Sequence, residues 1–149
     1  MSKSLHLSVQ YARRPRSWPK KVLWYKWMSM ALESTSGFVT LRLVDANEAT
    51  ILNETYRKKS YPTNILSFPY DDIDDSDTIY GDLVVCVPVV EKEILDQNKT
   101  LEEHLAHLVI HGMLHLQGYD HEMEEEAKIM EAKEIFLLNA LGYADPYNT

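Results

Sequence analysis

Histidines are concentrated in one short part of the sequence. Five of the six lie between residues 104 and 121, in the segment HLAHLVIHGMLHLQGYDH. His107, His111 and His115 follow one another at intervals of four residues. Each step of four turns a side chain by only about 40° around a helix, so in a helix all three would share one face. Because imidazoles on neighbouring turns can bind one ion, this spacing predicts a metal site.

The expected metal ligands are His111, His115 and His121. The first two are one helical turn apart, Gly118 is placed to end the helix in a left-handed conformation, and the returning chain can bring His121 to the same ion. Three imidazoles on Zn²⁺ leave one tetrahedral position for water, which is typical of catalytic sites. Structural zinc sites fill all four positions, mostly with cysteine, and this chain has one cysteine. The sequence therefore predicts one catalytic Zn²⁺ per chain.

Gly112 limits the reaction that such a site can catalyse. The spacing HxxxHxxGxxH over His111–His121 matches the zinc-binding pattern of the metzincin proteases. In those proteases the residue after the first histidine is a glutamate that acts as general base, and here it is glycine. Because glycine cannot transfer a proton, a zinc-dependent peptidase of metzincin type is only an alternative. Of the two remaining histidines, we expect His107 to be buried and hydrogen-bonded beside the ligands, and His104 to lie on the surface.

Composition places the chain among ordinary globular domains. Of its 149 residues, 45% are hydrophobic and 26% charged, so we expect a single domain over 1–149 that is neither disordered nor embedded in a membrane. The longest apolar stretch, residues 83–90, is too short to cross a bilayer. The N-terminus has no apolar segment of signal-peptide length, which predicts a cytoplasmic protein. Cys86, within LVVCVPVV, is expected to be a buried hydrophobic residue rather than a reactive thiol.

Charge is divided unevenly along the chain. Residues 1–60 hold 11 Lys/Arg and 4 Asp/Glu, a net charge of +7, whereas residues 61–149 hold 4 and 19, a net charge of −15. Much of the negative charge falls in the 71–77 loop and in the segment after His121. The net charge of −8 therefore does not exclude RNA, but it predicts that only one face can approach a polyanion.

Hydrophobic patterns predict the elements that must position these residues. Alternating or continuous apolar segments indicate four strands, at residues 3–10, 38–44, 64–68 and 79–87. Caps and breaks indicate helices at 17–34 (capped by Ser17), at 45–58 (Asp45 with Glu48), from Pro88, at 100–117 (Thr100 with Glu103) and at 122–141. Gly37 and Gly142 are interpreted as breaks, and Trp24, Trp27 and Phe68 as packing residues. This order predicts an α+β domain with a small mixed sheet of about four strands packed with helices.

Two longer signatures indicate a family. The run HGMLHLQGYDH (His111–His121), with LGYADPY near the C-terminus, resembles the YbeY family of metal-dependent endoribonucleases. Upstream, NETYRKKSYPTNILSFPY (Asn53–Tyr70) is similar to the other signature of that family, and YGDLVVC (Tyr80–Cys86) to its GD-containing strand.

The resemblance implies a zincin-like fold, a bound zinc ion and cleavage of single-stranded RNA. The implied process is ribosomal RNA maturation at the 16S 3′ end and ribosome quality control, with the ribosome or its proteins as partners. By position, the three predicted histidines match the metal ligands of the family. Arg57 matches its functionally important arginine, and Asp82 lies in its GD block.

Arg57 suits an RNA substrate chemically. A guanidinium can hold a phosphate bidentately and offset the charge that builds up in the transition state, and Lys58 and Lys59 would add attraction for phosphate. The proton-transfer group is left open between Asp120, which could instead orient a ligand or a water, and Asp82. The nucleophile is also open, between water at the ion and the RNA 2′-hydroxyl. A non-catalytic ribosome-associated RNA-binding module is the second alternative, and the open three-histidine site argues against it.

Overall fold

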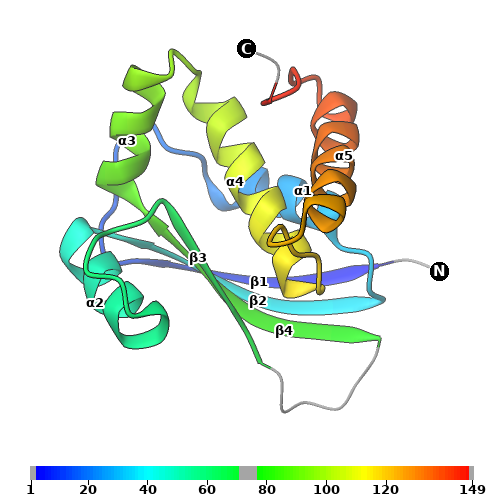
Figure 1. The fold of residues 1–149 in the computed structure, drawn as a ribbon, viewed down its shortest axis with the longest axis horizontal. Helices are drawn as coiled ribbons and strands as arrows, with labels where there is room; N and C mark the ends of the chain where they lie inside the picture. The colour runs from blue at the N-terminus through cyan, green and yellow to red at the C-terminus, as the bar shows by residue number, and fades with distance from the viewer. Residues whose placement is uncertain (1–2, 71–76, 148–149) are drawn as a thin grey trace.

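The computed structural model describes residues 3–70 and 77–147, and within them the chain forms five helices and four strands (Figure 1). In chain order the elements are β1 (Ser4–Tyr11), α1 (Lys21–Ala31), β2 (Ser36–Val44), α2 (Ala46–Arg57), β3 (Ile65–Pro69), β4 (Thr78–Cys86), α3 (Val87–Asp96), α4 (Leu101–Leu116) and α5 (Glu124–Ala140). The acidic loop predicted at 71–77 falls, apart from Asp77, outside the described residues.

The strands form one mixed sheet, as predicted. Their order is β1-β2-β4-β3, and β1, β2 and β4 are parallel. β3 runs antiparallel to β4 and forms one edge of the sheet, with Ser67 opposite Leu83. The prediction of an α+β domain with a small mixed sheet is therefore confirmed.

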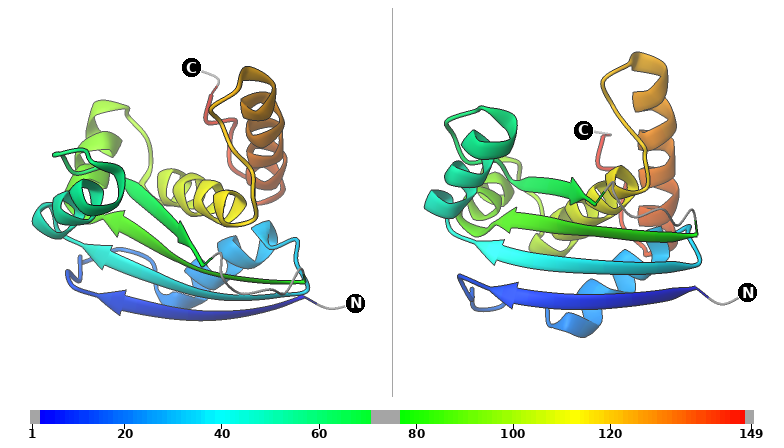
Figure 2. Two further views of the ribbon diagram at one scale, coloured as in Figure 1. Left: turned by 60° about the horizontal axis from the view of Figure 1, so that its bottom comes forward. Right: turned by 90° about the horizontal axis from the view of Figure 1, so that it is seen from below.

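Helices cover the two faces of the sheet unequally. α1 and α4 pack against one face along its length, and α5 lies beyond α4. On the other face α2 covers one end (Figure 2). Side chains alternate between the two faces: Leu83 and Val85 of β4 join the core under α1 and α4, whereas Val84 and Cys86 join the smaller cluster under α2.

The core confirms several predicted packing residues. Trp24 and Trp27 are both fully buried and meet edge to face, with ring centroids 5.5 Å apart. Cys86 is 1% exposed, and burial raises the pKa of its thiol, which suits a small hydrophobic residue. Phe68 packs against the α2 cluster. None of the helices described is long and apolar enough to cross a bilayer.

The first helix differs most from its prediction. α1 begins at Lys21 rather than after a Ser17 cap. Pro19 lies before the helix, and its carbonyl accepts a hydrogen bond from the Trp24 indole N–H (3.1 Å). The helix ends at Ala31 rather than near residue 34, because the chain there turns to contact the end of α4. The other predicted strands and helix ends agree with the structure to within two residues.

Gly37, predicted as a break, in fact lies inside β2.

Two other glycines, Gly81 and Gly112, let α4 approach the sheet closely. Gly81 of β4 faces the end of α4, where an added Cβ would lie 2.6 Å from Leu116 Cδ2 and 3.0 Å from the Phe68 carbonyl oxygen. On the helix side, a Cβ at Gly112 would lie 2.8 Å from Leu83 Cδ2. The side-chain-free surfaces at Gly81 and Gly112 therefore set the distance between α4 and the sheet.

We expect Gly81→Ala to lower the free energy of unfolding by about 1–3 kcal/mol, because the new methyl group overpacks the contact with Leu116 and the backbone of Phe68. Equilibrium unfolding in urea measures this value. A variant as stable as the parent would show that the contact between α4 and β4 can relax.

Candidate metal centre

The helix that carries the histidines has two different faces. α4 begins with the predicted capping box, in which the Thr100 hydroxyl accepts from the Glu103 N–H and the Glu103 carboxylate from the Thr100 N–H, each at 3.2 Å. One face of α4 is fully buried in the core, through Ala106, Val109, Ile110 and Met113. The face with His107, His111 and His115 borders a groove. Burial of the apolar face therefore fixes the direction of the histidines.

A tight turn at the end of α4 returns the chain to the same groove. Gly118 has a φ of 98°, as predicted, and its N–H donates to the His115 carbonyl (3.0 Å). The Gln117 side chain fastens this turn to the end of α1: its oxygen accepts from the Glu33 N–H (2.6 Å) and its amide donates to the Ala31 carbonyl (2.8 Å). The turn is thus held in place by contacts distant in sequence.

The structure brings the three predicted ligands together. His111, His115 and His121 each offer a ring nitrogen, and these nitrogens all lie within 4.8 Å of one another. His115 Nε2 is 3.0 Å from His121 Nδ1. His111 and His115 are half-buried, and His121 is exposed. Zinc–nitrogen bonds are about 2.0–2.1 Å long, so three nitrogens this close can converge on one ion. The cluster therefore fits a metal with imidazole ligands.

Electrostatics keeps His115 available as a ligand. Burial lowers its pKa, the neighbouring His111 and His121 lower it further, and the Arg57 cation adds to the effect, while Asp120 opposes it. A lower pKa favours the neutral imidazole, which is the form that binds a metal.

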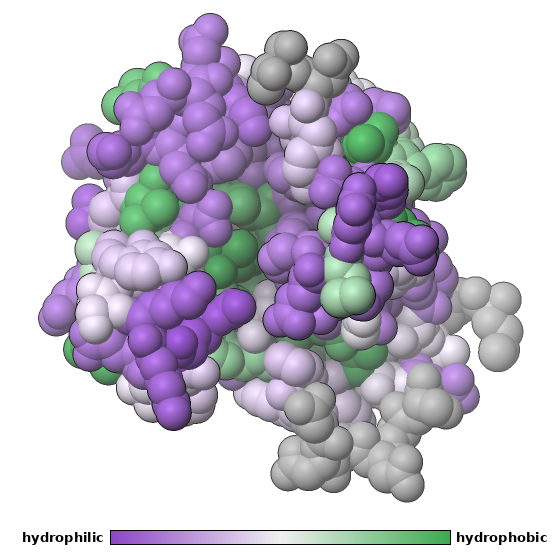
Figure 3. All heavy atoms as spheres, viewed as in Figure 1, coloured by the Kyte–Doolittle hydropathy of each residue, from purple (hydrophilic) through white to green (hydrophobic). Residues whose placement is uncertain are grey.

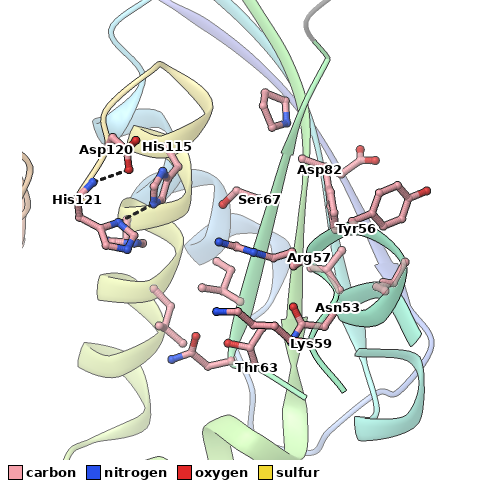
Figure 4. A pocket seen from close by; sticks show the side chains of 18 of the residues that line it. Asn53, Tyr56, Arg57, Lys59, Thr63, Ser67, Asp82, His115, Asp120 and His121 are labelled. Carbon is pink, nitrogen blue, oxygen red and sulfur yellow. Dashed lines mark hydrogen bonds between the residues drawn. The ribbon is translucent and has the colours of Figure 1, made fainter. Parts of the chain in front are cut away.

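Asp120 lies beside the histidines, as predicted, and contacts the backbone of the returning chain. Its Oδ1 accepts from the His121 N–H (2.7 Å; Figure 4) and also from the Glu122 N–H (3.3 Å). These bonds hold the backbone on either side of the His121 side chain. The contact fits the expectation that Asp120 orients a ligand.

Glu134 of α5 completes the cluster, and the sequence reasoning missed it. It is 0% exposed, and its two oxygens contact His111 Nδ1 (2.6 Å) and His107 Nε2 (2.8 Å). The Tyr147 hydroxyl also donates to it. Burial alone would raise the pKa of Glu134, but the three hydrogen bonds outweigh burial and lower it to about 2. The available signal was a carboxylate at helical spacing from the apolar Met130 and from residues 137–138.

Of the other two histidines, His107 has the environment that was predicted and His104 does not. His107 is hydrogen-bonded to Glu134 beside the cluster, as expected. His104 is not on the surface: it is 5% exposed, and its Nε2 pairs with Glu93 Oε1 (2.9 Å). Glu93 also accepts from Asn64 (3.2 Å). His104 is buried because its side of α4 is covered by α3.

The opposite wall of the groove comes from α2 and β3. Asp45 Oδ1 caps α2 by accepting from the Glu48 N–H (2.9 Å), and the Glu48 carboxylate pairs with Arg42 instead of completing the predicted box. α2 ends at Arg57 and is capped by Lys58, which has a φ of 58°. The left-handed conformation of Lys58 reverses the chain, so that Arg57 and Lys59 both line the groove.

The groove has a volume of about 1280 Å³. Figure 3 shows this side of the molecule hollowed at its centre, with apolar residues in the hollow and polar residues around it. In Figure 4 the side chains of Arg57, Lys59 and Ser67 extend toward the side on which His115 and His121 lie. A cationic wall thus faces the histidine cluster.

Asp82 also borders the groove, but its side chain points away from the histidines. Its neighbours Gly81 and Leu83 face α4, so the Asp82 side chain lies on the opposite face of the sheet. Figure 4 shows it pointing away from His115 and His121. There it accepts a hydrogen bond from the Tyr70 hydroxyl (2.6 Å), which raises the pKa of Tyr70 to about 12. The position of Asp82 within the GD-containing block did not indicate which face of the sheet its side chain occupies.

An α+β fold that opens three histidines onto a groove with a facing arginine is typical of a metal-dependent hydrolase. Comparison with known proteins gives the family: Endoribonuclease YbeY matches residues 7–142. The chain therefore belongs to the YbeY family. This match covers nearly the whole chain and confirms the resemblance that the two signatures indicated.

Individual relatives support this membership. The chain is 50% identical over 149 residues to an Endoribonuclease YbeY from Herminiimonas arsenicoxydans, covering 96% of this chain and 95% of that one. It is 45% identical over 145 residues to an Endoribonuclease YbeY from Methylobacillus flagellatus, covering 97% and 95%. Among solved structures, the solution structure of TM1509 from Thermotoga maritima matches with a TM-score of 0.50 and 25% identity, covering 100% of both chains.

The lowered pKa of Glu134 predicts a pH-dependent contribution to stability. The folded-state pKa of about 2 is below the usual value, so the carboxylate stabilises the fold fully above about pH 4.5 and loses this effect as the pH falls toward 2. We expect metal-free Glu134→Gln to be less stable than the parent at pH 6 by a few kcal/mol. The difference should shrink below pH 4.5. A difference that stays constant down to pH 2.5 in urea unfolding would contradict the assignment.

Proposed function

We propose that this protein is a zinc-dependent endoribonuclease that hydrolyses phosphodiester bonds in single-stranded RNA. The carrying observation is the cluster of His111, His115 and His121, which faces Arg57 across one groove in a chain of the YbeY family. The relatives named above are endoribonucleases by name. By its fold and family the chain is an enzyme acting on RNA, and the zinc ion and the residue roles are our assignment.

The three histidines would hold the ion. All three ligands are imidazoles on a single chain, and the fourth position of a tetrahedral zinc ion would face the groove. When bound, zinc acts as a Lewis acid toward a phosphoryl oxygen and lowers the pKa of water to about 7. The chain supplies the geometry through the burial of α4 and the Gln117 contacts.

Arg57 and the lysine beyond it would hold the substrate. Arg57 lines the groove opposite the histidines, with Lys59 beside it. A guanidinium can donate two parallel hydrogen bonds to a phosphate and stabilise additional negative charge in the transition state. Lys59 would add attraction for the backbone that depends on salt concentration. The preference for single strands is assigned from membership of the YbeY family.

Two routes for nucleophilic attack are consistent with the site: attack by water, and attack by the RNA 2′-hydroxyl. Asp120 is assigned to orienting His121, because its Oδ1 is already engaged by two backbone N–H groups. Asp82 points to the other face of the sheet and is not assigned a proton-transfer role. A substrate with a 2′-deoxy group at the cleavage position separates the routes, because attack by water does not need the hydroxyl.

We place this activity in ribosomal RNA maturation, at the 16S 3′ end, and in ribosome quality control, in the cytoplasm, with the ribosome or its proteins as partners. The support for this placement is family membership. The +7 charge of residues 1–60, which include Arg57 and Lys59, suits an RNA contact on the groove side.

A zinc peptidase is the second candidate, and Gly112 disfavours it for a structural reason. The position that would hold the general base of a metzincin is packed against Leu83, with 2.8 Å between an added Cβ and Leu83 Cδ2. A glutamate there would need a rearranged core. A non-catalytic RNA-binding module, the other alternative, has no use for three imidazoles with an open position.

One assay separates these classes. Zinc-loaded and chelator-treated protein are incubated with a single-stranded ribosomal RNA fragment, the same fragment as a duplex, its 2′-deoxy analogue and a peptide pool, and the product ends are mapped. We expect cleavage of the single-stranded RNA but not of the duplex or the peptides, and only with metal. Cleavage of the 2′-deoxy analogue would indicate attack by water, and its resistance would indicate attack by the 2′-hydroxyl. Chelator-sensitive cleavage of peptides would support the peptidase instead, and RNA binding without cleavage would support the binding module.

The histidine cluster predicts a metal stoichiometry. We expect about one zinc ion per chain, and its loss in the His111→Ala/His115→Ala double variant, because two of three ligands are removed. Elemental analysis after dialysis measures both values. His104→Ala serves as the control, since His104 pairs with Glu93 on another side of α4. Equal zinc content in the double variant and the parent would contradict the site.

If Arg57 holds the substrate, removing its side chain should lower catalysis and leave metal binding intact. We expect Arg57→Ala to lower kcat/KM on single-stranded RNA by about 100-fold or more, the range for removing one donor to a charged transition state. Zinc content and stability should stay near those of the parent, because Arg57 is exposed. Lys58→Ala is the matched control, because this neighbouring cation, contrary to the expectation from the sequence, does not line the groove. Unchanged turnover in Arg57→Ala would remove the arginine from the site.

A further inference from the structure

We propose that Glu134 is a positioning residue that determines which ring nitrogens, and which of the neighbouring histidines, face the metal. This inference rests on the proposed metal site. It adds a role for a residue of α5 that is not one of the predicted ligands. The contacts of the two carboxylate oxygens carry it.

The first contact sets the orientation of a ligand. Glu134 Oε2 is 2.6 Å from His111 Nδ1. A carboxylate accepts hydrogen bonds, so Nδ1 carries the proton and Nε2 of His111 is left with its lone pair. Because ring rotation would break this bond, Glu134 fixes both the tautomer and the direction of the His111 ring before any ion binds.

The second contact withholds a competing histidine. His107 lies one turn before His111 on the same face of α4 and could form an i, i+4 pair with it as readily as His115 does. Its Nε2 is instead 2.8 Å from Glu134 Oε1 and 3.2 Å from the Tyr147 hydroxyl. With that nitrogen occupied, His107 can offer Nε2 to an ion only by breaking its bond to Glu134.

Burial shows that Glu134 is not there for packing. It is 0% exposed and lies on the face of α5 that carries the buried Met130, Leu137 and Leu138. A charged group in such a position costs free energy that an apolar side chain of similar size would avoid. The carboxylate is tolerated because three donors surround it, and two of these donors are histidines of α4.

Tyr147 extends the arrangement to the C-terminal segment. Its hydroxyl donates to Glu134, and its backbone N–H is anchored by Asp145 Oδ1 (2.8 Å). The Tyr147 ring also meets that of His107 edge to face, with centroids 5.3 Å apart. The segment after α5 thus helps to keep His107 turned away from the ion.

The test compares zinc affinity by competition with a chelator, separately from RNA cleavage. We expect Glu134→Gln to bind zinc about 10–100-fold more weakly than the parent, the effect typical of removing a carboxylate behind a histidine ligand. Met130→Ala is the matched control, because Met130 is buried one turn earlier on α5 and its thioether cannot replace the carboxylate that accepts from His107 and His111. Tyr147→Phe should weaken binding less than Glu134→Gln does.

The outcomes separate this inference from the proposed function. A parent protein that binds no zinc would overturn the metal site itself. A parent that binds one zinc ion, with Glu134→Gln within twofold of its affinity, would overturn only the role of Glu134. An equal loss in Met130→Ala would also overturn it, because general destabilisation would then explain the effect.

A second measurement needs no variant and covers the case in which Glu134→Gln does not fold. Nitrogen-15 NMR of the metal-free parent near pH 7.5 reports the protonated ring nitrogen of each histidine. We expect a proton on Nδ1 of His111 and on Nε2 of His107. The opposite tautomer at His111 would overturn the proposal.

Discussion

The packing of one face of α4 against the sheet is the constraint on which the site depends. Gly81 and Gly112 remove the side chains that would separate helix and sheet, and the buried residues of α4 then leave only one direction in which its histidines can point. Because metal binding needs nitrogens placed to within about half an ångström, hydrophobic packing provides the precision that the ligands require.

The two walls of the groove are built independently. The histidine wall comes from α4 and the turn fastened by Gln117 to the end of α1. The cationic wall comes from the end of α2, where the buried Asn53 donates to the Tyr61 carbonyl (2.7 Å) and so holds the chain after Arg57. The edge strand β3 lies between them. Since each wall has its own anchors, changes in the substrate-contacting wall need not disturb the metal ligands.

Much of the fold could be predicted because its signals are local. The capping box at Thr100, the left-handed Gly118 and the alternating pattern of β1 depend on residues close in sequence. The exceptions have tertiary causes. α1 starts late because Pro19 is engaged by the Trp24 indole, and His104 is buried because α3, with Glu93, packs over it. A single sequence does not specify such contacts.

The sequence by itself determined which histidines can meet, since the i, i+4 spacing of His111 and His115 and the glycine-terminated turn before His121 are local features. It also determined the family. Only the tertiary structure decided the surroundings of the ligands. It placed Asp82 on the far side of the sheet, because a residue's face depends on strand pairing, and it brought Glu134 from a separate helix to His111. Local spacing fixes which groups can meet on one element, whereas the packing of elements decides which groups meet across them.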